Sequence, residues 1–162
     1  MTEHLFTAEA PQIAFQLPAP GEGETLTLAF DLEPPADFKP GKQVRLCHVR
    51  LQGVKGLPKK SEIFELKVSA NGQLVCELSG FGNKRPEFVE PLKLGQPTGA
   101  YEVNYDPADG EVSIGDATGE THIKSGERPI EVLFGFDLKG KTLTAPIGWV
   151  LRWDGDSPAV WG

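Results

Sequence analysis

The sequence contains few cysteines: Cys47 and Cys76 are the two in a chain of 162 residues. Small secreted domains held together by disulfide bonds need several pairs, so the composition excludes that class. Both cysteines stand in stretches that alternate apolar and polar residues, and we expect two buried free thiols, with a disulfide as the less favoured alternative. No apolar run approaches the roughly 20 residues of a membrane-spanning helix, so we expect no membrane partner.

A secretion signal is also missing from the N-terminal stretch MTEHLFTAEAPQIAF, which has neither a basic segment nor an apolar core. Such a signal needs both features. The sequence therefore leaves the localisation unknown, with the cytoplasm, a virion and a non-classical export route as open alternatives.

Recognisable catalytic and metal-binding spacings are absent as well. The histidines are His4, His48 and His122, and no His or Cys pair has the spacing of a zinc site. Cys47 and His48 are adjacent, but neighbouring residues of a strand point to opposite faces and cannot act together as nucleophile and base. The acidic stretch DPADGE, residues 106–111, is explained as a hairpin turn more simply than as a calcium loop. We therefore expect no cofactor, no metal ion and no enzymatic activity.

Glycine and proline, by contrast, are plentiful, with 19 and 14 residues that together make about a fifth of the chain. They interrupt the sequence at short intervals, which is typical of an all-β protein. No window of 10–12 residues free of them carries a helical stripe. We predict an all-β fold, an antiparallel β-sandwich or jelly roll of roughly 9–11 strands. Residues 1–23 form an extended N-terminal arm, and residues 24–162 form a single domain.

Strands are predicted where apolar residues alternate with polar ones, in residues 13–17, 25–32, 130–136 and 147–153. The stretch QVRLCHVRL, residues 43–51, is apolar on both faces. This pattern favours a central strand or a strand with a β-bulge.

Two hairpin registers follow from the requirement that one face be apolar. A three-residue loop at residues 70–72 pairs Phe64, Leu66 and Val68 with Leu78, Cys76 and Leu74, and we expect all six to be buried. The outer face then carries Lys67, Ser69 and Gln73, expected to be exposed, and the like-charged pair Glu65 and Glu77. A four-residue loop at residues 107–110 pairs Tyr105 with Val112 and Val103 with Ile114.

The net charge of −7 is distributed unevenly along the chain. Residues 1–38 hold seven acids and no Lys or Arg, residues 39–93 eleven Lys or Arg and five Glu, and residues 94–162 eleven acids and five bases. Strands from different thirds can interleave in the fold and cancel this segregation. The alternative is an acidic arm that reaches a basic face of a neighbouring copy or a partner. Nucleic acid is a poor fit, because the basic third lacks interleaved aromatic residues.

These features favour a non-enzymatic structural or interaction protein, a subunit or accessory component of a larger assembly such as a decoration or tail component of a virion. We expect a protein partner or self-association. The candidate interface residues are Ile13, Phe15 and Leu17 of the arm, Lys59, Lys60, Lys84, Arg85 and the near-terminal Trp161. The apolar residues of the arm are able to add a strand to an exposed sheet edge of another chain or of its own. Trp161 either folds back over the sandwich or anchors a partner.

Two alternative functions remain open. One is a module that binds carbohydrate or another ligand, with Tyr101, Tyr105 or Trp161 stacked on a sugar. The other is a β-sandwich enzyme whose acidic residues converge only in the fold, where two carboxylates roughly 5–10 Å apart in a cleft would favour it.

Overall fold

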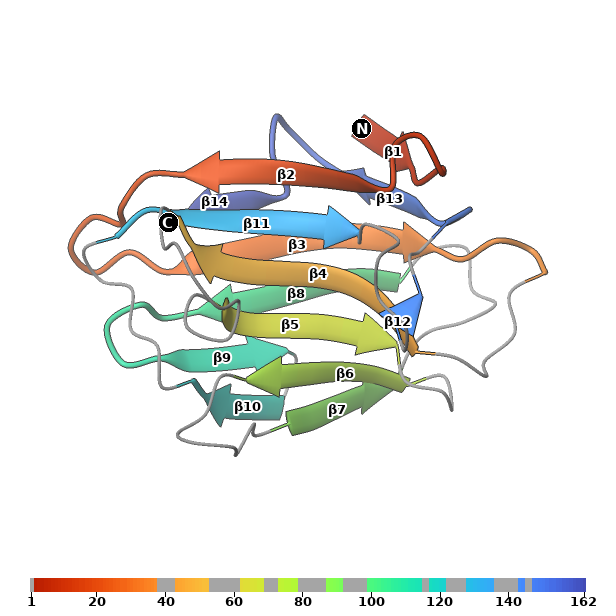
Figure 1. The fold of residues 1–162 in the computed structure, drawn as a ribbon. Helices are drawn as coiled ribbons and strands as arrows, with labels where there is room; N and C mark the ends of the chain where they lie inside the picture. Colours follow the sequence, from red (N-terminus) through yellow and green to blue (C-terminus); the bar gives the residue numbers. More distant parts are fainter. Residues whose placement is uncertain are drawn as a thin grey trace.

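Two β-sheets stack face to face to form the fold (Figure 1). The computed structural model describes residues 2–37, 43–52, 62–68, 73–78, 87–91, 99–114, 117–121, 128–135, 143–144 and 147–162. The predicted all-β antiparallel sandwich is confirmed. The described residues form fourteen strands rather than the roughly nine to eleven expected. Some of the additional strands are only two to four residues long, too short to show an alternating pattern.

Sheet A has the strand order β1-β13-β3-β8-β9-β10, and β14 also pairs with β3. Its strands are β1 (Thr2–Leu5), β3 (Leu26–Glu33), β8 (Gly99–Tyr105), β9 (Glu111–Ile114), β10 (Ala117–Glu120), β13 (Val150–Trp153) and β14 (Ala159–Trp161). Along one edge of β3, β14 pairs with Leu26–Leu28 and β13 with Asp31–Glu33. The partner of β3 therefore changes near its middle, at Ala29 and Phe30.

Sheet B, the nearer layer in Figure 1, has the order β2-β11-β4-β5-β6-β7, and the short β12 pairs with β4. Its strands are β2 (Gln12–Leu17), β4 (Gln43–Leu51), β5 (Glu62–Val68), β6 (Gln73–Leu78), β7 (Glu87–Pro91), β11 (Ile130–Gly135) and β12 (Leu143–Thr144). The β12–β4 pair is parallel, and the other pairs in the described residues are antiparallel. Strand β4 is central, as the sequence predicted.

Both hairpin registers predicted from the sequence are confirmed. Strand β5 meets β6 with Phe64 opposite Leu78, Leu66 opposite Cys76 and Val68 opposite Leu74. Strand β8 meets β9 with Val103 opposite Ile114 and Tyr105 opposite Val112. The loop after β8 is a true turn, because the carboxylates of Asp106 and Asp109 accept hydrogen bonds from the backbone of Ala108 and Glu111.

The core lies between the inner faces of the two sheets and includes most of the residues predicted to be buried. Phe64, Leu66, Val68, Cys76 and Leu78 are buried as expected, whereas the side chains of Ser69, Gln73 and Leu74 lie outside the described part. Cys47 and Cys76 are buried free thiols, as predicted. Ile147 is exposed, because β13 begins only at Val150, after the alternating stretch has started.

Residues 2–17 supply an edge strand to each sheet. Strand β1 pairs with β13, the chain crosses between the sheets at Phe6, and β2 pairs with β11. The buried Phe6 fixes the crossing, because its backbone binds Trp149 at 3.0 Å and Gly148 at 2.8 Å. The arm was expected to add a strand to a sheet edge of another chain or of its own chain. In the structure, β1 and β2 occupy edges of the chain's own sheets.

No helix in the described residues is long and apolar enough to cross a membrane.

Candidate functional site

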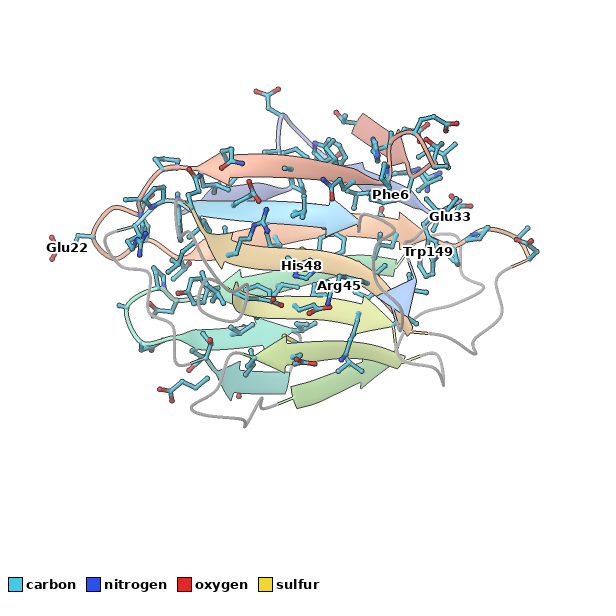
Figure 2. The ribbon with its side chains drawn as sticks, viewed as in Figure 1. Phe6, Glu22, Glu33, Arg45, His48 and Trp149 are labelled. Carbon is cyan, nitrogen blue, oxygen red and sulfur yellow. The ribbon has the colours of Figure 1, made fainter. Side chains whose placement is uncertain are left out.

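The outward surface of sheet B carries a concentration of charged and polar side chains, which we call the polar face of sheet B. Its members come from five adjacent strands: Gln16 of β2, Glu131 of β11, Arg45, His48 and Arg50 of β4, Glu62, Glu65 and Lys67 of β5, and Glu77 of β6. Figure 2 labels Arg45 and His48 over β4 and β5 in the nearer sheet. The inward residues of the same strands, such as Val49, Leu66 and Phe134, belong to the core.

Two irregularities in the pairing of β4 with β5 assemble this face. Leu46 is an extra residue between Arg45 and Cys47, and Ile63 is an extra residue opposite the step from Val49 to Arg50. A bulged residue shifts the alternation of its strand by one position. Arg45 and His48, three residues apart, therefore both face outward. The same reason places Glu62 beside Glu65.

Polar contacts cross these strands in three groups, which we together call the polar network. Arg45 donates to Glu65 at 2.7 Å, and His48 Nδ1 lies 3.3 Å from Glu62 Oε1. Lys67 binds Glu77 at 2.7 Å, and Arg50 donates from Nε to Glu131 at 2.7 Å. Gln16 donates to the other oxygen of Glu131. The like-charged Glu65 and Glu77, which lie opposite each other as predicted, are thus each neutralised by a separate base.

The centre of this network is unusually well covered for the outer surface of a sheet. Glu65 is 3% exposed, Glu77 9% and His48 8%. Lys67 was expected to be exposed, but this prediction is wrong: 14% of its side chain is accessible, because it lies along the sheet to reach Glu77. Burial raises the pKa of Glu65, and the neighbouring carboxylate of Glu62 raises it further. The positive charges of His48 and Arg45 oppose this increase in pKa. Charged groups are rarely covered to this degree unless they are paired, as these are.

One part of the polar face has the donor set of a metal site. His48, Glu62 and Glu65 each offer a ligand atom, and these atoms lie within 4.8 Å of one another. The 3.3 Å between His48 Nδ1 and Glu62 Oε1 equals the edge of a tetrahedron with zinc–ligand bonds of about 2.0–2.1 Å. Arg45 occupies one oxygen of Glu65, however, so both carboxylates already have partners without a metal ion.

The outer surface of sheet A contains a cavity of about 400 Å³ above β3, where its partner changes from β14 to β13. It is lined by Thr27, Ala29, Phe30, Asp31, Tyr101, Glu102, Arg152, Trp153, Asp154, Ser157, Pro158 and Val160. Arg152 is directed to Glu33 at 2.6 Å and to Glu3 at 3.1 Å. Two buried atoms of the lining residues, Asp31 Oδ1 and Trp153 Nε1, have no hydrogen-bond partner among the described residues.

Four of the eight residues predicted to form a protein interface lie in the described part of the chain, and their side chains pack inward. Leu17 belongs to the core, Ile13 and Phe15 pack against it, and so does Trp161, whose Nε1 donates to the carbonyl of Pro18 at 2.8 Å. These apolar side chains contact the chain's own interior. Lys59, Lys60, Lys84 and Arg85 lie outside the described residues.

The aromatic residues considered for sugar stacking occupy different positions. Tyr105 is fully buried and cannot stack on a ligand. Tyr101 is 8% exposed and lines the cavity of sheet A. The polar face of sheet B was not predicted as a site, although the stretch QVRLCHVRL, apolar on both sides, did indicate the bulge that turns Arg45 and His48 outward.

Comparison with known proteins identifies the fold. No family model matches the sequence, and no curated protein matches it. Among solved structures, an alginate lyase from Pseudomonas aeruginosa is similar over 100% of this chain and 87% of its own, with a TM-score of 0.54 and 11% identity. A polysaccharide lyase of family 18 covers 86% of this chain and 70% of its own (TM-score 0.54, 9% identity). Alginate lyase AlyC3 in complex with dimannuronate covers 98% and 70% (TM-score 0.51, 7% identity).

At these identities the matches establish a shared jelly-roll β-sandwich. They also correct the main functional interpretation drawn from the sequence. A structural or accessory subunit of an assembly is the wrong interpretation, because the solved structures that share the fold include several polysaccharide lyases. The sequence misled because it contains no local catalytic motif, whereas a sandwich builds its site from residues on separate strands. The two alternatives, a ligand-binding module and an enzyme, account for the findings better.

Proposed function

We propose that the chain is a carbohydrate-binding β-sandwich that holds a neutral saccharide against the polar face of sheet B. The observation that carries this proposal is the network of paired polar side chains that crosses β2, β11, β4, β5 and β6. The similarity of the fold to that of polysaccharide lyases supports a saccharide as the ligand class.

The chemistry of the network suits sugar hydroxyls. Each hydroxyl both donates and accepts hydrogen bonds, so a receptor needs fixed donors beside fixed acceptors. Arg45, Lys67 and Arg50 supply charged donors, each held by a carboxylate of a neighbouring strand, and Glu131, whose side chain is 17% exposed, is the most accessible acceptor among these carboxylates. Because cross-strand partners already hold these side chains in place, little side-chain entropy is lost when a ligand binds.

The balance of charge favours a neutral saccharide over an acidic one. Three cationic side chains, Arg45, Arg50 and Lys67, face four carboxylates, those of Glu62, Glu65, Glu77 and Glu131. The described residues of this face would therefore present no net positive charge to a polyuronate such as alginate. We accordingly propose that the described residues recognise hydroxyl groups rather than carboxylates.

Binding without catalysis remains our proposal, as expected from the sequence. The enzyme alternative has one observation in its favour, because the carboxylates of Glu62 and Glu65 come within 4.8 Å in the fold. Glycosidase pairs stand roughly 5–9.5 Å apart, and both groups must reach the substrate. Glu65 is almost fully covered and bound to Arg45, which argues against its direct contact with a glycosidic bond. Release of reducing sugar or of unsaturated product from any bound glycan would decide for the enzyme.

A glycan array followed by calorimetric titration tests the proposal. The test variant is Arg50→Gln, because its side chain is 45% exposed and its loss does not leave a deeply buried charge unpaired. The matched control is Arg128→Gln, since Arg128 is exposed and, among the described residues, donates to the carbonyl of Gln52 rather than to a carboxylate. We expect a neutral oligosaccharide to bind, and Arg50→Gln to weaken it about tenfold, the value of one hydrogen bond to a charged group. Absence of any neutral ligand, or equal affinity in the two variants, would contradict the proposal.

A further inference from the structure

The groups of the polar network differ in how far solvent reaches their side chains. The exposed fraction is 3% for Glu65 and 14% for Lys67, but 45% for Arg50. Gln16, on the edge strand β2, is exposed as well. The polar face of sheet B is therefore most open where β2, β11 and β4 lie next to one another (Figure 1).

One row of polar side chains crosses these three strands. Glu131 of β11 lies opposite Gln16 of β2 on one side and opposite Arg50 of β4 on the other. Arg50 donates from Nε and Nη2 to Glu131 Oε1, and Gln16 donates from Nε2 to Glu131 Oε2. Because a carboxylate only accepts, the amide nitrogen of Gln16 faces Glu131 and the amide oxygen is left to accept from a ligand. The guanidinium of Arg50 carries five N–H groups, so it keeps donors for a ligand beside this acceptor.

The next row along the same strands is apolar. Leu133 stands two positions after Glu131 on β11 and lies opposite Ala14 of β2. Ala14 is exposed, and Leu133 is half-buried and outside the core to which Val132 and Phe134 belong. Two positions along a strand span about 6.6 Å, so one sugar ring is large enough to contact both rows.

A polar row beside an apolar row matches the two kinds of surface on a pyranose ring. Equatorial hydroxyls project from the rim of the ring and leave C–H groups on its two faces. A ring that lies with one face on Ala14 and Leu133 directs its rim hydroxyls to the row that Glu131 organises. An axial hydroxyl would instead project from the face into the apolar pair, where it would lose its hydrogen bonds to water.

We infer that the two rows form an anchoring subsite for one hexopyranose ring of the gluco configuration, whose ring hydroxyls are equatorial. This edge subsite consists of Gln16, Glu131, Arg50, Ala14 and Leu133. The rest of the glycan continues across β4 toward β5. The inference rests on the proposed function and deepens it, because it names the sugar and the side chains that hold it.

Calorimetric titration with cellohexaose, a neutral chain of such rings, tests the inference. Gln16→Ala removes the amide acceptor and should weaken binding about fivefold, the value of one hydrogen bond. Leu133→Ala removes most of the apolar row and should weaken binding by a similar factor. The matched control is Gln12→Ala, which changes the same residue type at an exposed position of the same strand, opposite Gly135 rather than a carboxylate. It should leave the affinity unchanged.

Mannohexaose is the matched ligand, because each of its rings carries one axial hydroxyl. It should bind about tenfold more weakly than cellohexaose. Melting temperatures of the variants equal to that of the wild type would show that any loss of binding is not a loss of folding.

The outcomes separate this inference from the proposed function. If Arg50→Gln weakens binding of a neutral glycan but Gln16→Ala or Leu133→Ala binds as tightly as Gln12→Ala, the proposed function stands and the edge subsite is refuted. The edge subsite is also refuted if mannohexaose binds as tightly as cellohexaose, or if another neutral glycan binds and cellohexaose does not. Absence of binding by every neutral glycan overturns both.

Discussion

The polar side chains on the two outer faces of the sandwich differ in how they are paired and in how far they are exposed. On sheet B, charged residues pair across neighbouring strands and are covered to the point that Glu65 is 3% exposed. On sheet A, the ion pairs of Arg152 are more open, since Glu3 and Glu33 are 65% and 46% exposed, and Asp31 lines a cavity. Sheet B thus presents paired and largely covered polar side chains, and sheet A presents more exposed ion pairs beside a small cavity.

The difference arises from strand pairing rather than from composition. Bulges at Leu46 and Ile63 collect charged residues of β4 and β5 on one side. On sheet A, regular alternation along β3 places Thr27, Ala29 and Asp31 outward, and the change of partner strand leaves space beside them. A saccharide that needs many hydroxyl contacts matches the first arrangement.

The largest loss of stability should come from substitutions in the core that both sheets share. Here we expect no difference between a residue of sheet A and a residue of sheet B. Leu66 of sheet B and Leu28 of sheet A are each 0% exposed. Either Leu66→Ala or Leu28→Ala should lower the free energy of unfolding by about 2–5 kcal/mol, as large-to-small core substitutions do. Urea denaturation measures both. A loss below roughly 0.5 kcal/mol for Leu66→Ala would mean that the register of β5 is wrong.

A smaller effect should separate the two faces directly. Arg45→Met removes a partner of the covered Glu65 and should cost about 1–3 kcal/mol of unfolding free energy. Arg152→Met removes the partner of two more exposed glutamates and should cost less than about 1 kcal/mol. Urea denaturation of the pair checks the order. Equal losses would show that the network of sheet B is no more constrained than an ordinary surface.

The pH dependence of stability sharpens the same contrast. Burial raises the pKa of Glu65 above 4.5, so the native state retains a proton that the unfolded chain releases. Stability then falls as the pH rises from 4.5 through the raised pKa. Glu65→Gln abolishes this titration. The unfolding free energy of the wild type should therefore decline relative to that of Glu65→Gln between pH 4.5 and 7 in urea titrations. Parallel curves for the two proteins would contradict the account.

The smallest expected effect is that of metal ions. Arg45 and His48 already give Glu65 and Glu62 their partners, so we predict no stoichiometric zinc or calcium. Adding zinc should leave the melting temperature unchanged. A rise that a chelator reverses would show that His48, Glu62 and Glu65 bind the ion, because a ligand specific for the native state must stabilise it.

The features of the fold that could be predicted from the sequence are those that depend on residues close together in the chain. The hairpin registers of β5–β6 and β8–β9 were predictable because a tight turn and an apolar face specify them locally. The bulge in β4 was partly visible, since its stretch is apolar on both faces. The bulge at Ile63 was not predicted, although the adjacent apolar residues Ile63 and Phe64 interrupt the alternation of the strand there.

The candidate sites depended on contacts that no local pattern encodes. Glu131 approaches Arg50 across 81 positions, and Asp31 comes opposite Arg152 only because β13 returns to pair with β3. The low exposure of Lys67 was not predicted, because it depends on how this side chain and its neighbours lie along the sheet.

Mapping a bound neutral oligosaccharide by amide chemical shifts tests the central claim most directly. The account predicts that the glycan selected by the array perturbs the outward positions of β4, β5 and β11, including His48, Lys67 and Glu131. The outward positions of β3 and β13 should remain unchanged. Perturbations confined to sheet A, or tighter binding of alginate oligosaccharides than of any neutral glycan, would contradict the assignment of the polar face of sheet B as the saccharide site.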